Sequence, residues 1–279
     1  MSQDSLENQL FLEQRRLVVV LEGVEDRDVV SSWCGYKSLA VDAYAATDVE
    51  VPILDRFHGY GDNKARVASL IATERFSDYV DRSLIGIVDR DVDGVVRPWL
   101  EVLGLYYSEF CTLTSGVLFG TVLSGIMQES FGGVMSRDFI IEISRFYRRH
   151  YVLFALKERF SGGKGLPAVD KSVRRLVDGG FDWISYISKV KAVLGWKSSP
   201  ERILSFLDRR STDDDVRMVA RYHDSLRYLW ILSRKEGLID KTVSLDEMYR
   251  HMRVHLMHLR QGRELELIEN KTRALQAVL

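Results

Sequence analysis

Two short apolar runs that end abruptly in carboxylates constrain the fold more than any other feature of the chain. The first run ends in Glu22, with Asp26 one helical turn later, and the second ends in Asp89, with Asp91 and Asp93 at the next alternate positions. Buried parallel strands have this β-branched composition, and ligands of open α/β sheets lie at the carboxyl ends of the strands. If the two runs are neighbouring strands, their carboxylates repel one another unless a cation neutralises them.

The rest of the first part of the chain alternates apolar runs with helical patterns, which is typical of a parallel α/β sheet. The expected strands are 16–21, 49–54, 84–89 and 103–108, and the expected helices between them are 25–34, 62–76 and 95–101. From residue 136 on, helical periodicity predominates. The expected helices there are 136–160, 170–177, 181–194, 200–208, 213–235 and 245–275.

We therefore expect an α/β fold with a Rossmann-like parallel sheet over residues 1–125. A mostly helical region over residues 126–279 follows, for contacts with a substrate, a partner or a second copy. A chain of 279 residues is long enough for one large domain or two modest ones.

Composition excludes some classes of protein. The net charge of −1 excludes a globally basic nucleic-acid binder, so any such binding must be local. Two cysteines, Cys34 and Cys111, form neither a metal motif nor a disulfide framework, which fits a reducing cytoplasm.

No signal-peptide pattern opens the sequence. The charge-free stretch 110–128 is diluted by Ser, Thr and Gly, so we expect a buried strand and helix there and no membrane contact.

Glu22 is the strongest candidate for a catalytic role, as a metal ligand or as a general base on an attacking water. Asp89 and Asp91 share one face if the segment is extended, and Asp93 continues that face. Mg²⁺, or Mn²⁺ in its place, takes few carboxylates and leaves positions open for phosphate oxygens. The plain alternative is a solvated cluster at the strand ends.

Two of these carboxylates also have ordinary structural interpretations. Asp26 is either a ligand of a second ion or a charge that complements the start of a helix. Asp93 is either a ligand or, with Gly94 after it, part of a turn.

A glycine-rich loop leads into the helix expected at residue 62 and carries Lys64 and Arg66. Free backbone N–H groups and cations at a helix start can bind phosphate, and an ordinary turn is the alternative. The spacing is not that of a Walker loop. Arg90 points away from its two aspartate neighbours in an extended segment, so we expect a structural ion-pair partner there.

Together, the two acidic motifs resemble those of the TOPRIM domain, which occurs in topoisomerases, bacterial primases, recombination mediators, ribosomal-RNA maturases and the overcoming-lysogenization-defect nucleases. The matching residues are Glu22-Gly23-x-x-Asp26 and Asp89-x-Asp91-x-Asp93-Gly94. The resemblance covers roughly residues 14–115. It implies a Rossmann-like sheet that binds Mg²⁺ through Glu22 and the pair Asp89 and Asp91.

A narrower resemblance links the chain to small TOPRIM proteins encoded beside ABC-type ATPases, such as the effectors of the PARIS phage-defence group. It rests on the loop Phe57–Lys64 and on Arg221–Leu226, which contains His223. It implies a metal-dependent endoribonuclease that an ABC-type ATPase holds inactive and releases on infection, and that is toxic through tRNA cleavage. We expect Lys64, Arg66 and His223 to contact the substrate and the active form to be a homodimer.

Two other functions are compatible with the same residues. One is a non-catalytic regulatory module of an ATPase complex, and the other is a DNA nuclease or a ribosomal-RNA maturase with the same site. The function expected first is a toxic anti-phage RNA nuclease.

Two helical patterns outside the acidic motifs also admit two interpretations each. Arg145, Arg148 and Arg149, with Tyr147 and Tyr151, form either an RNA-binding patch with stacking or a solvated helix face.

The second pattern is a stripe of histidines on the last long helix. His251, His255 and His258 form either a transition-metal site or a packed face, which we expect to be a docking surface for a partner or a second copy.

Overall fold

The computed structural model describes residues 1–109, 112, 115, 118, 120–160, 165–210, 222–258 and 263–277, without the side chains of 222–224 and 256–258. The chain forms two compact units whose segments interleave along the sequence. The sheet unit comprises Met1–Arg90, Trp99–Thr114 and Leu256–Leu279. The helical unit comprises Asp91–Pro98 and Ser115–His255. The residues after 256, assigned from the sequence to the helical region, thus pack with the sheet.

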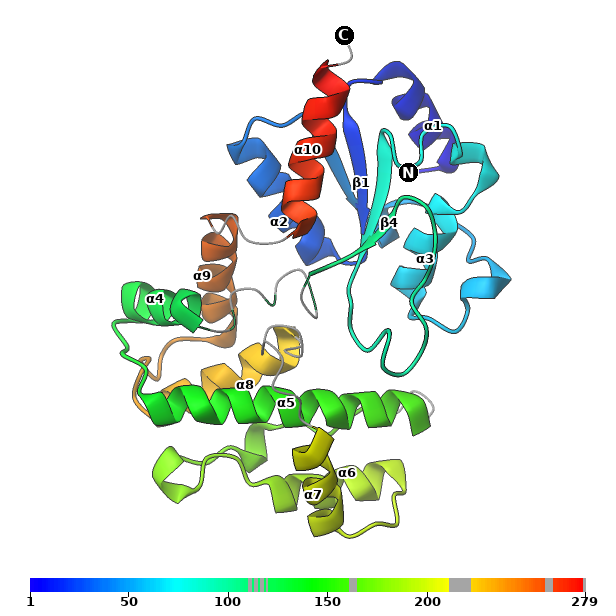
Figure 1. The fold of residues 1–279 in the computed structure, drawn as a ribbon. Helices are drawn as coiled ribbons and strands as arrows, with labels where there is room; N and C mark the ends of the chain where they lie inside the picture. Colours follow the sequence, from blue (N-terminus) through cyan, green and yellow to red (C-terminus); the bar gives the residue numbers. More distant parts are fainter. Residues whose placement is uncertain are drawn as a thin grey trace. The chain divides into compact units, whose positions relative to one another are not determined.

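The sheet unit contains a four-stranded, all-parallel sheet in the order β2-β1-β3-β4 (Figure 1). Its strands are β1 (Leu17–Leu21), β2 (Val41–Ala45), β3 (Leu84–Val88) and β4 (Leu105–Tyr107). The central strands β1 and β3 are buried along their whole length, which explains their unbroken apolar runs. The parallel α/β class expected from the sequence is confirmed.

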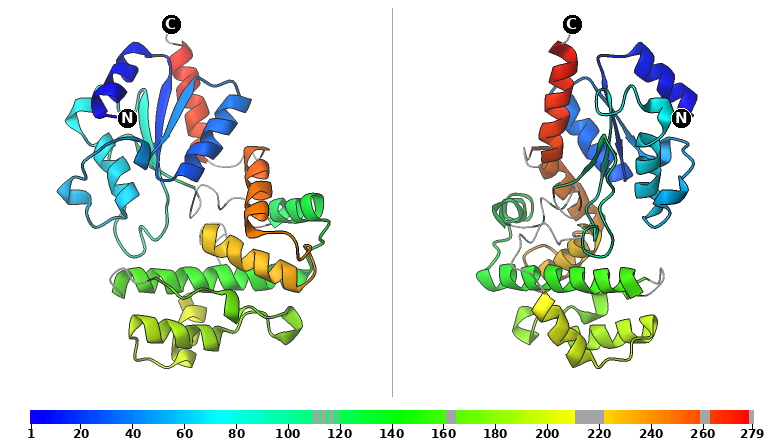
Figure 2. Two further views of the ribbon diagram at one scale, coloured as in Figure 1. Left: turned by 180° about the vertical axis from the view of Figure 1, so that it is seen from behind. Right: turned by 45° about the vertical axis from the view of Figure 1, so that its right-hand side comes forward.

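Helices cover both faces of this sheet. The helices of the unit are α1 (Gln3–Leu12), α2 (Val24–Tyr36), α3 (Asp62–Ile71) and α10 (Arg263–Ala277), with short 3₁₀ turns at Ala46–Asp48, Asp55–Phe57 and Glu74–Phe76. Helices α2 and α10 lie on one face, where Lys37 pairs with Glu269 at 3.7 Å, and α1 and α3 lie on the other (Figures 1 and 2).

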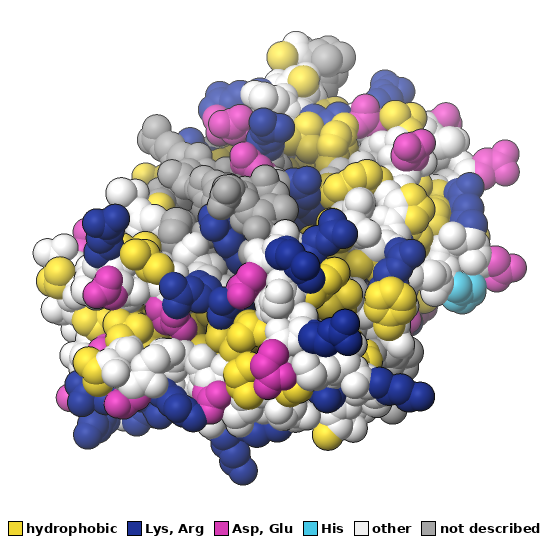
Figure 3. Space-filling model, turned by 60° about the horizontal axis from the view of Figure 1, so that its bottom comes forward, with side chains coloured by type: hydrophobic (Ala, Val, Ile, Leu, Met, Phe, Trp, Pro, Cys, Tyr) yellow, Lys and Arg dark blue, Asp and Glu magenta, His cyan; other side chains and the backbone are white. Residues whose placement is uncertain are grey.

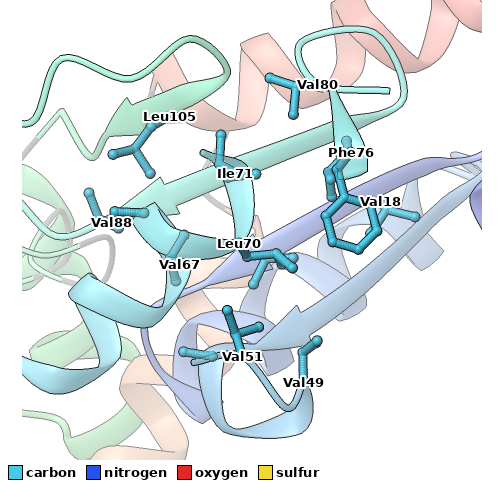
Figure 4. Close-up of a cluster of buried hydrophobic side chains, with 14 of the residues drawn as sticks. Val18, Val49, Val51, Val67, Leu70, Ile71, Phe76, Val80, Val88 and Leu105 are labelled. Atoms are coloured by element: carbon cyan, nitrogen blue, oxygen red, sulfur yellow. The ribbon is translucent and has the colours of Figure 1, made fainter. Parts of the chain in front are cut away.

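Three expectations about this part of the chain are wrong. Residues 49–54 form no strand, because Val49 and Val51 are buried in the core beneath α3 without pairing in the sheet (Figure 4). Residues 95–101 form no helix. The helix expected at 62–76 ends at Ile71.

The main core of the sheet unit lies between the sheet and α3. Gly86 of β3 permits this close packing, because a Cβ at residue 86 would lie 2.7 Å from Val67 Cγ1 and 2.9 Å from Ile71 Cγ1. Both atoms belong to buried side chains in the centre of the cluster (Figure 4). Position 86 therefore has room for glycine alone.

Gly86→Ala is expected to lower the free energy of unfolding by about 1–3 kcal/mol, the usual cost of overpacking a filled core. The matched control is Gly35→Ala, near the end of α2, where a Cβ would meet nothing within 4 Å. That change should raise stability by up to about 1 kcal/mol, since alanine is the better helix former. Urea unfolding followed by circular dichroism measures both, and a stabilised Gly86→Ala protein would contradict the packing described.

The helical unit consists of α4 (Gly120–Phe131), α5 (Arg137–Phe160), α6 (Trp183–Leu194), α7 (Pro200–Arg210), α8 (Tyr222–Lys235) and α9 (Leu245–His258). Residues 170–177, expected as a helix, contain the 3₁₀ turns Asp170–Ser172 and Leu176–Asp178 instead. The first part of the helix expected at 213–235 lies outside the described residues, and the helix expected at 245–275 is two helices, α9 and α10.

Aromatic rings fill the core of this unit around a buried carboxylate. Phe146 stacks on Tyr228 with ring centroids 3.7 Å apart. Glu142, which is 5% exposed, accepts hydrogen bonds from the Phe181 N–H at 3.0 Å and from the Tyr228 hydroxyl at 3.2 Å. Burial raises the pKa of Glu142, and nearby Arg145 opposes that rise.

The charge-free stretch 110–128 falls partly outside the described residues, and its end forms the first part of α4. Among the described helices, none has both the length and the apolar character needed to cross a bilayer.

Candidate active site at the ends of strands β1 and β3

The site lies where the order of the strands reverses. The chain passes from β1 outward to β2 on one side, and then returns past β1 to β3 and β4 on the other. The two strands at the reversal pair in parallel register, with Leu21 opposite Ile87. Glu22 directly follows β1 and Asp89 directly follows β3, so both residues lie at the carboxyl ends of adjacent strands, the edge at which open α/β sheets bind ligands.

A hydrogen bond joins these two strand ends. The carboxylate of Glu22 accepts it from the Asp89 backbone N–H at 3.1 Å. Glu22 itself is half-buried, and the strand before it is fully buried. Its carboxylate is therefore held in one place at the end of β1.

Lys64 supplies a cation beneath the same edge of the sheet. It lies in the first turn of α3, is 0% exposed, and donates from Nζ to the Asp89 carbonyl oxygen at 2.6 Å. The ring of Tyr107, at the end of β4, lies 5.7 Å from the same ammonium group. Lys64 thus supports the end of β3 from inside the protein, which differs from the surface phosphate contact expected from the sequence.

Asp26 lies in the first turn of α2, which begins directly after Gly23. The carboxylate folds back over the start of the helix, since a Cβ at residue 23 would lie 2.8 Å from Asp26 Oδ2. Asp26 is 9% exposed. Its position is that of a charge complementing the helix dipole, the second of its two predicted roles.

Asp91 and Asp93 do not continue the strand. Strand β3 ends at Val88, and Asp91 has a φ of +42°, in the left-handed region. The expectation that alternate aspartates share one face of an extended segment is therefore wrong. By their contacts Asp91 and Asp93 belong to the helical unit, where buried Asp93 pairs with Arg97.

The other basic residues singled out from the sequence, Arg90, Arg66 and His223, have different environments. Arg90 lies over the ring of Trp99 at 5.2 Å and donates to the Glu109 carbonyl oxygen at 3.5 Å. Arg66 is half-buried on α3. His223 lies at the start of α8, and its side chain is outside the described part of the chain.

A second acidic pair, Glu109 and Glu264, lies at the end of β4, and it was not predicted from the sequence. The Glu109 carboxylate accepts from the backbone N–H of Arg263 at 3.1 Å, and the Glu264 carboxylate accepts from the N–H of Glu109 at 3.2 Å. Burial, and then the charge of Glu109, raises the pKa of Glu264. These reciprocal bonds hold the start of α10 at the end of β4. The sequence signal available was the pair of acidic residues in the first turn of α10.

Of the basic and aromatic residues expected to form a patch on α5, the structure brings the arginines together but buries Tyr147. Arg145, Arg148 and Arg149 line one pocket of about 410 Å³ within the helical unit. Tyr147 is 1% exposed, which excludes it from stacking on a base, and Tyr151 donates its hydroxyl to the Asp91 carbonyl oxygen at 2.9 Å.

The histidines of α9 pack against α4. The ring of His251 meets that of Phe131 at 4.9 Å, and His255 Nε2 lies 3.2 Å from Ser130 Oγ. These two histidines thus lie on a face that packs within the helical unit, and docking of a partner or a second copy there stays a prediction. The side chain of His258 is outside the described residues.

Glu22 and Asp89, at the ends of β1 and β3, carry carboxylate oxygens, the kind of ligand that a hard divalent ion such as Mg²⁺ takes. Mg²⁺ is usually held by one or two carboxylates, with waters and substrate phosphates completing the shell. Glu22 and Asp89 would hold it. Within the described residues, no cluster of three or more His, Cys, Asp and Glu side chains has the arrangement of a metal site.

Cys34, on α2, is buried, and burial raises the pKa of its thiol to about 12, which makes it an unreactive core residue.

No protein-family model matches the chain, and a search of curated proteins found no match for it.

Proposed function

We propose that the protein is a Mg²⁺-dependent phosphodiesterase of the TOPRIM type that cuts RNA. The observation that carries this proposal is the joining of Glu22 and Asp89 at the strand reversal between β1 and β3. Two acidic residues at the carboxyl ends of adjacent parallel strands suit a site for a metal ion and a phosphate.

The residues of the chain have distinct tasks in this proposal. The Glu22 carboxylate, oriented by the Asp89 N–H, accepts a proton from the attacking water. Lys64 fixes the end of β3 through the Asp89 carbonyl oxygen and offsets part of the local negative charge. A bound Mg²⁺ would polarise a phosphoryl oxygen and lower the pKa of a bound water.

The narrower parts of the proposal rest on the resemblance to the PARIS group. They are tRNA as the substrate, toxicity during phage infection, control by an ABC-type ATPase, and a homodimer as the active form. A role for His223 in substrate binding belongs to the same resemblance, whereas a catalytic role for Asp91 rests on the broader resemblance to the TOPRIM domain.

The test is to induce the chain in cells and sequence the cellular RNA, and to incubate the purified chain with bulk tRNA and with plasmid DNA. We expect new RNA 5′ ends in the cells, cutting of tRNA with Mg²⁺ or Mn²⁺, and no cutting in EDTA. Mapping the ends separates tRNA from ribosomal RNA as the substrate. Cutting of the plasmid with intact RNA would replace the proposal by a DNA nuclease.

One observation favours a second candidate, a non-catalytic module that binds an ATPase. Because the buried ammonium of Lys64 lies at the strand ends, part of the negative charge is neutralised by the protein itself. In that case the chain co-purifies with the ATPase, and RNA remains intact in every assay above.

A further inference from the structure

A pocket of about 620 Å³ in the helical unit combines aromatic rings with cations. It lies between the end of α5 and α7, which lines it from the first turn to the last, with the loop before α7 at its side. Its rings are those of Phe160, Trp196 and Phe206. Its volume is within the range of about 300–1,000 Å³ that small-molecule sites have, which is room enough for a nucleotide-sized group.

The cations of the pocket are Lys197, Arg202 and Arg209. All three are exposed, no carboxylate is among the described residues that line the pocket, and none of the three pairs with a carboxylate elsewhere in the described chain. Like charges gathered in this way repel one another and favour an anionic occupant. On the face shown in Figure 3, Lys and Arg side chains lie interspersed with hydrophobic ones.

Each of the three rings retains exposed surface. Phe160 is 66% exposed, with Arg159 over its ring at 5.8 Å. Trp196 and Phe206 are half-buried, with Arg210 over the Phe206 ring at 5.6 Å. Helix α7 begins at Pro200 beside the pocket, with the Ser199 hydroxyl accepting from the Arg202 N–H at 3.3 Å. The positive end of this helix adds to the cationic character of the site.

We propose that this pocket, here called the α5–α7 pocket, binds single-stranded RNA, with bases stacked on the rings and phosphates at the cations. Single strands present bases and phosphates in alternation, which matches rings and cations side by side. An acidic peptide without aromatic side chains would satisfy the cations but leave the ring of Trp196 without a stacking partner. The proposal shares RNA with the proposed function but needs neither a metal ion nor cleavage.

The test uses the full chain carrying Glu22→Gln, in EDTA, so that binding is measured without cutting. The probe is a fluorescein-labelled single-stranded RNA of mixed sequence, followed by anisotropy over a range of salt concentrations. Trp196→Ala is expected to weaken binding at least about tenfold, because one base loses its stacking partner. Trp196→Phe, which keeps a ring, should bind within about threefold of the parent.

Arg202→Ala with Arg209→Ala is expected to reduce the slope of log K against log salt by roughly 1.4, since each phosphate contact on a single strand contributes about 0.7. The matched control is Arg175→Ala with Lys241→Ala, which removes the same charge from exposed positions of the helical unit outside the pocket. The control should leave that slope unchanged.

Three results would overturn the proposal. In the first, the pocket variants and the control variants change RNA binding equally. In the second, Trp196→Ala keeps a native circular dichroism spectrum and binds RNA as tightly as the parent. In the third, a peptide of alternating Glu and Phe binds through Trp196 but does not displace the RNA. This assay measures binding without cleavage. Its outcomes therefore test the α5–α7 pocket even if the protein proves not to be a nuclease.

Discussion

Replacing Glu22 with glutamine is expected to lower the rate of Mg²⁺-dependent RNA cleavage by about 10³-fold, within the range for loss of a general base. Glutamine keeps an oxygen that can accept the hydrogen bond from the Asp89 N–H, so the strand ends stay joined. It removes the negative charge and the proton acceptor. The measurement is single-turnover cleavage of labelled tRNA over a range of Mg²⁺ concentrations.

The matched control for this change is Glu74→Gln, which removes the same charge at an exposed position just beyond the end of α3. It should cut RNA at the parent rate. If Glu22→Gln also cut at that rate, Glu22 would be neither base nor ligand, and the non-catalytic module would become the better account.

Lys64→Met is expected to lower the same cleavage rate by about 10²-fold, because a small displacement of a catalytic group has an effect of that size. Methionine fills similar space but cannot donate to the Asp89 carbonyl oxygen, which Lys64 does at 2.6 Å. Lys64 is a positioning residue in this view. Removing its charge should also lower the Mg²⁺ concentration for half-maximal cleavage, since a cation beside the carboxylates competes with the metal ion.

The stability of the Lys64→Met protein separates the two roles of this lysine. Loss of a hydrogen bond to a charged donor should cost about 1.5–3 kcal/mol of unfolding free energy. Lys37→Met, which breaks the part-exposed pair with Glu269, should cost less than about 1 kcal/mol. A Lys64→Met protein that is less stable but cuts RNA normally, with an unchanged Mg²⁺ requirement, would limit Lys64 to a structural role.

The sequence predicted the central strands well because their signal is local. An unbroken β-branched run has few alternatives to a buried parallel strand, and β1 and β3 are buried throughout. Their adjacency then brings Glu22 and Asp89 together. The edge strand β2 was missed because its Asp42 and Tyr44 break the apolar pattern, both being half-buried at the side of the sheet.

The rest of the site depends on geometry that spacing cannot supply. The pairing of Asp89 with Asp91 assumed that extension persists beyond β3, whereas the positive φ of Asp91 turns the chain. Lys64 follows a glycine-rich loop and would be exposed on an isolated helix. Its burial comes from the packing of α3 against β3 and β4, a tertiary effect that no local pattern encodes.

The packing of α10 against β1 has a consequence for synthesis in the cell. Strand β1, at residues 17–21, waits for its covering helix until residues 263–277 have left the ribosome. The bonds between the end of β4 and the start of α10 form equally late. A nascent chain therefore cannot complete the sheet unit before residue 277 has emerged, and any activity housed in that unit would be delayed until then.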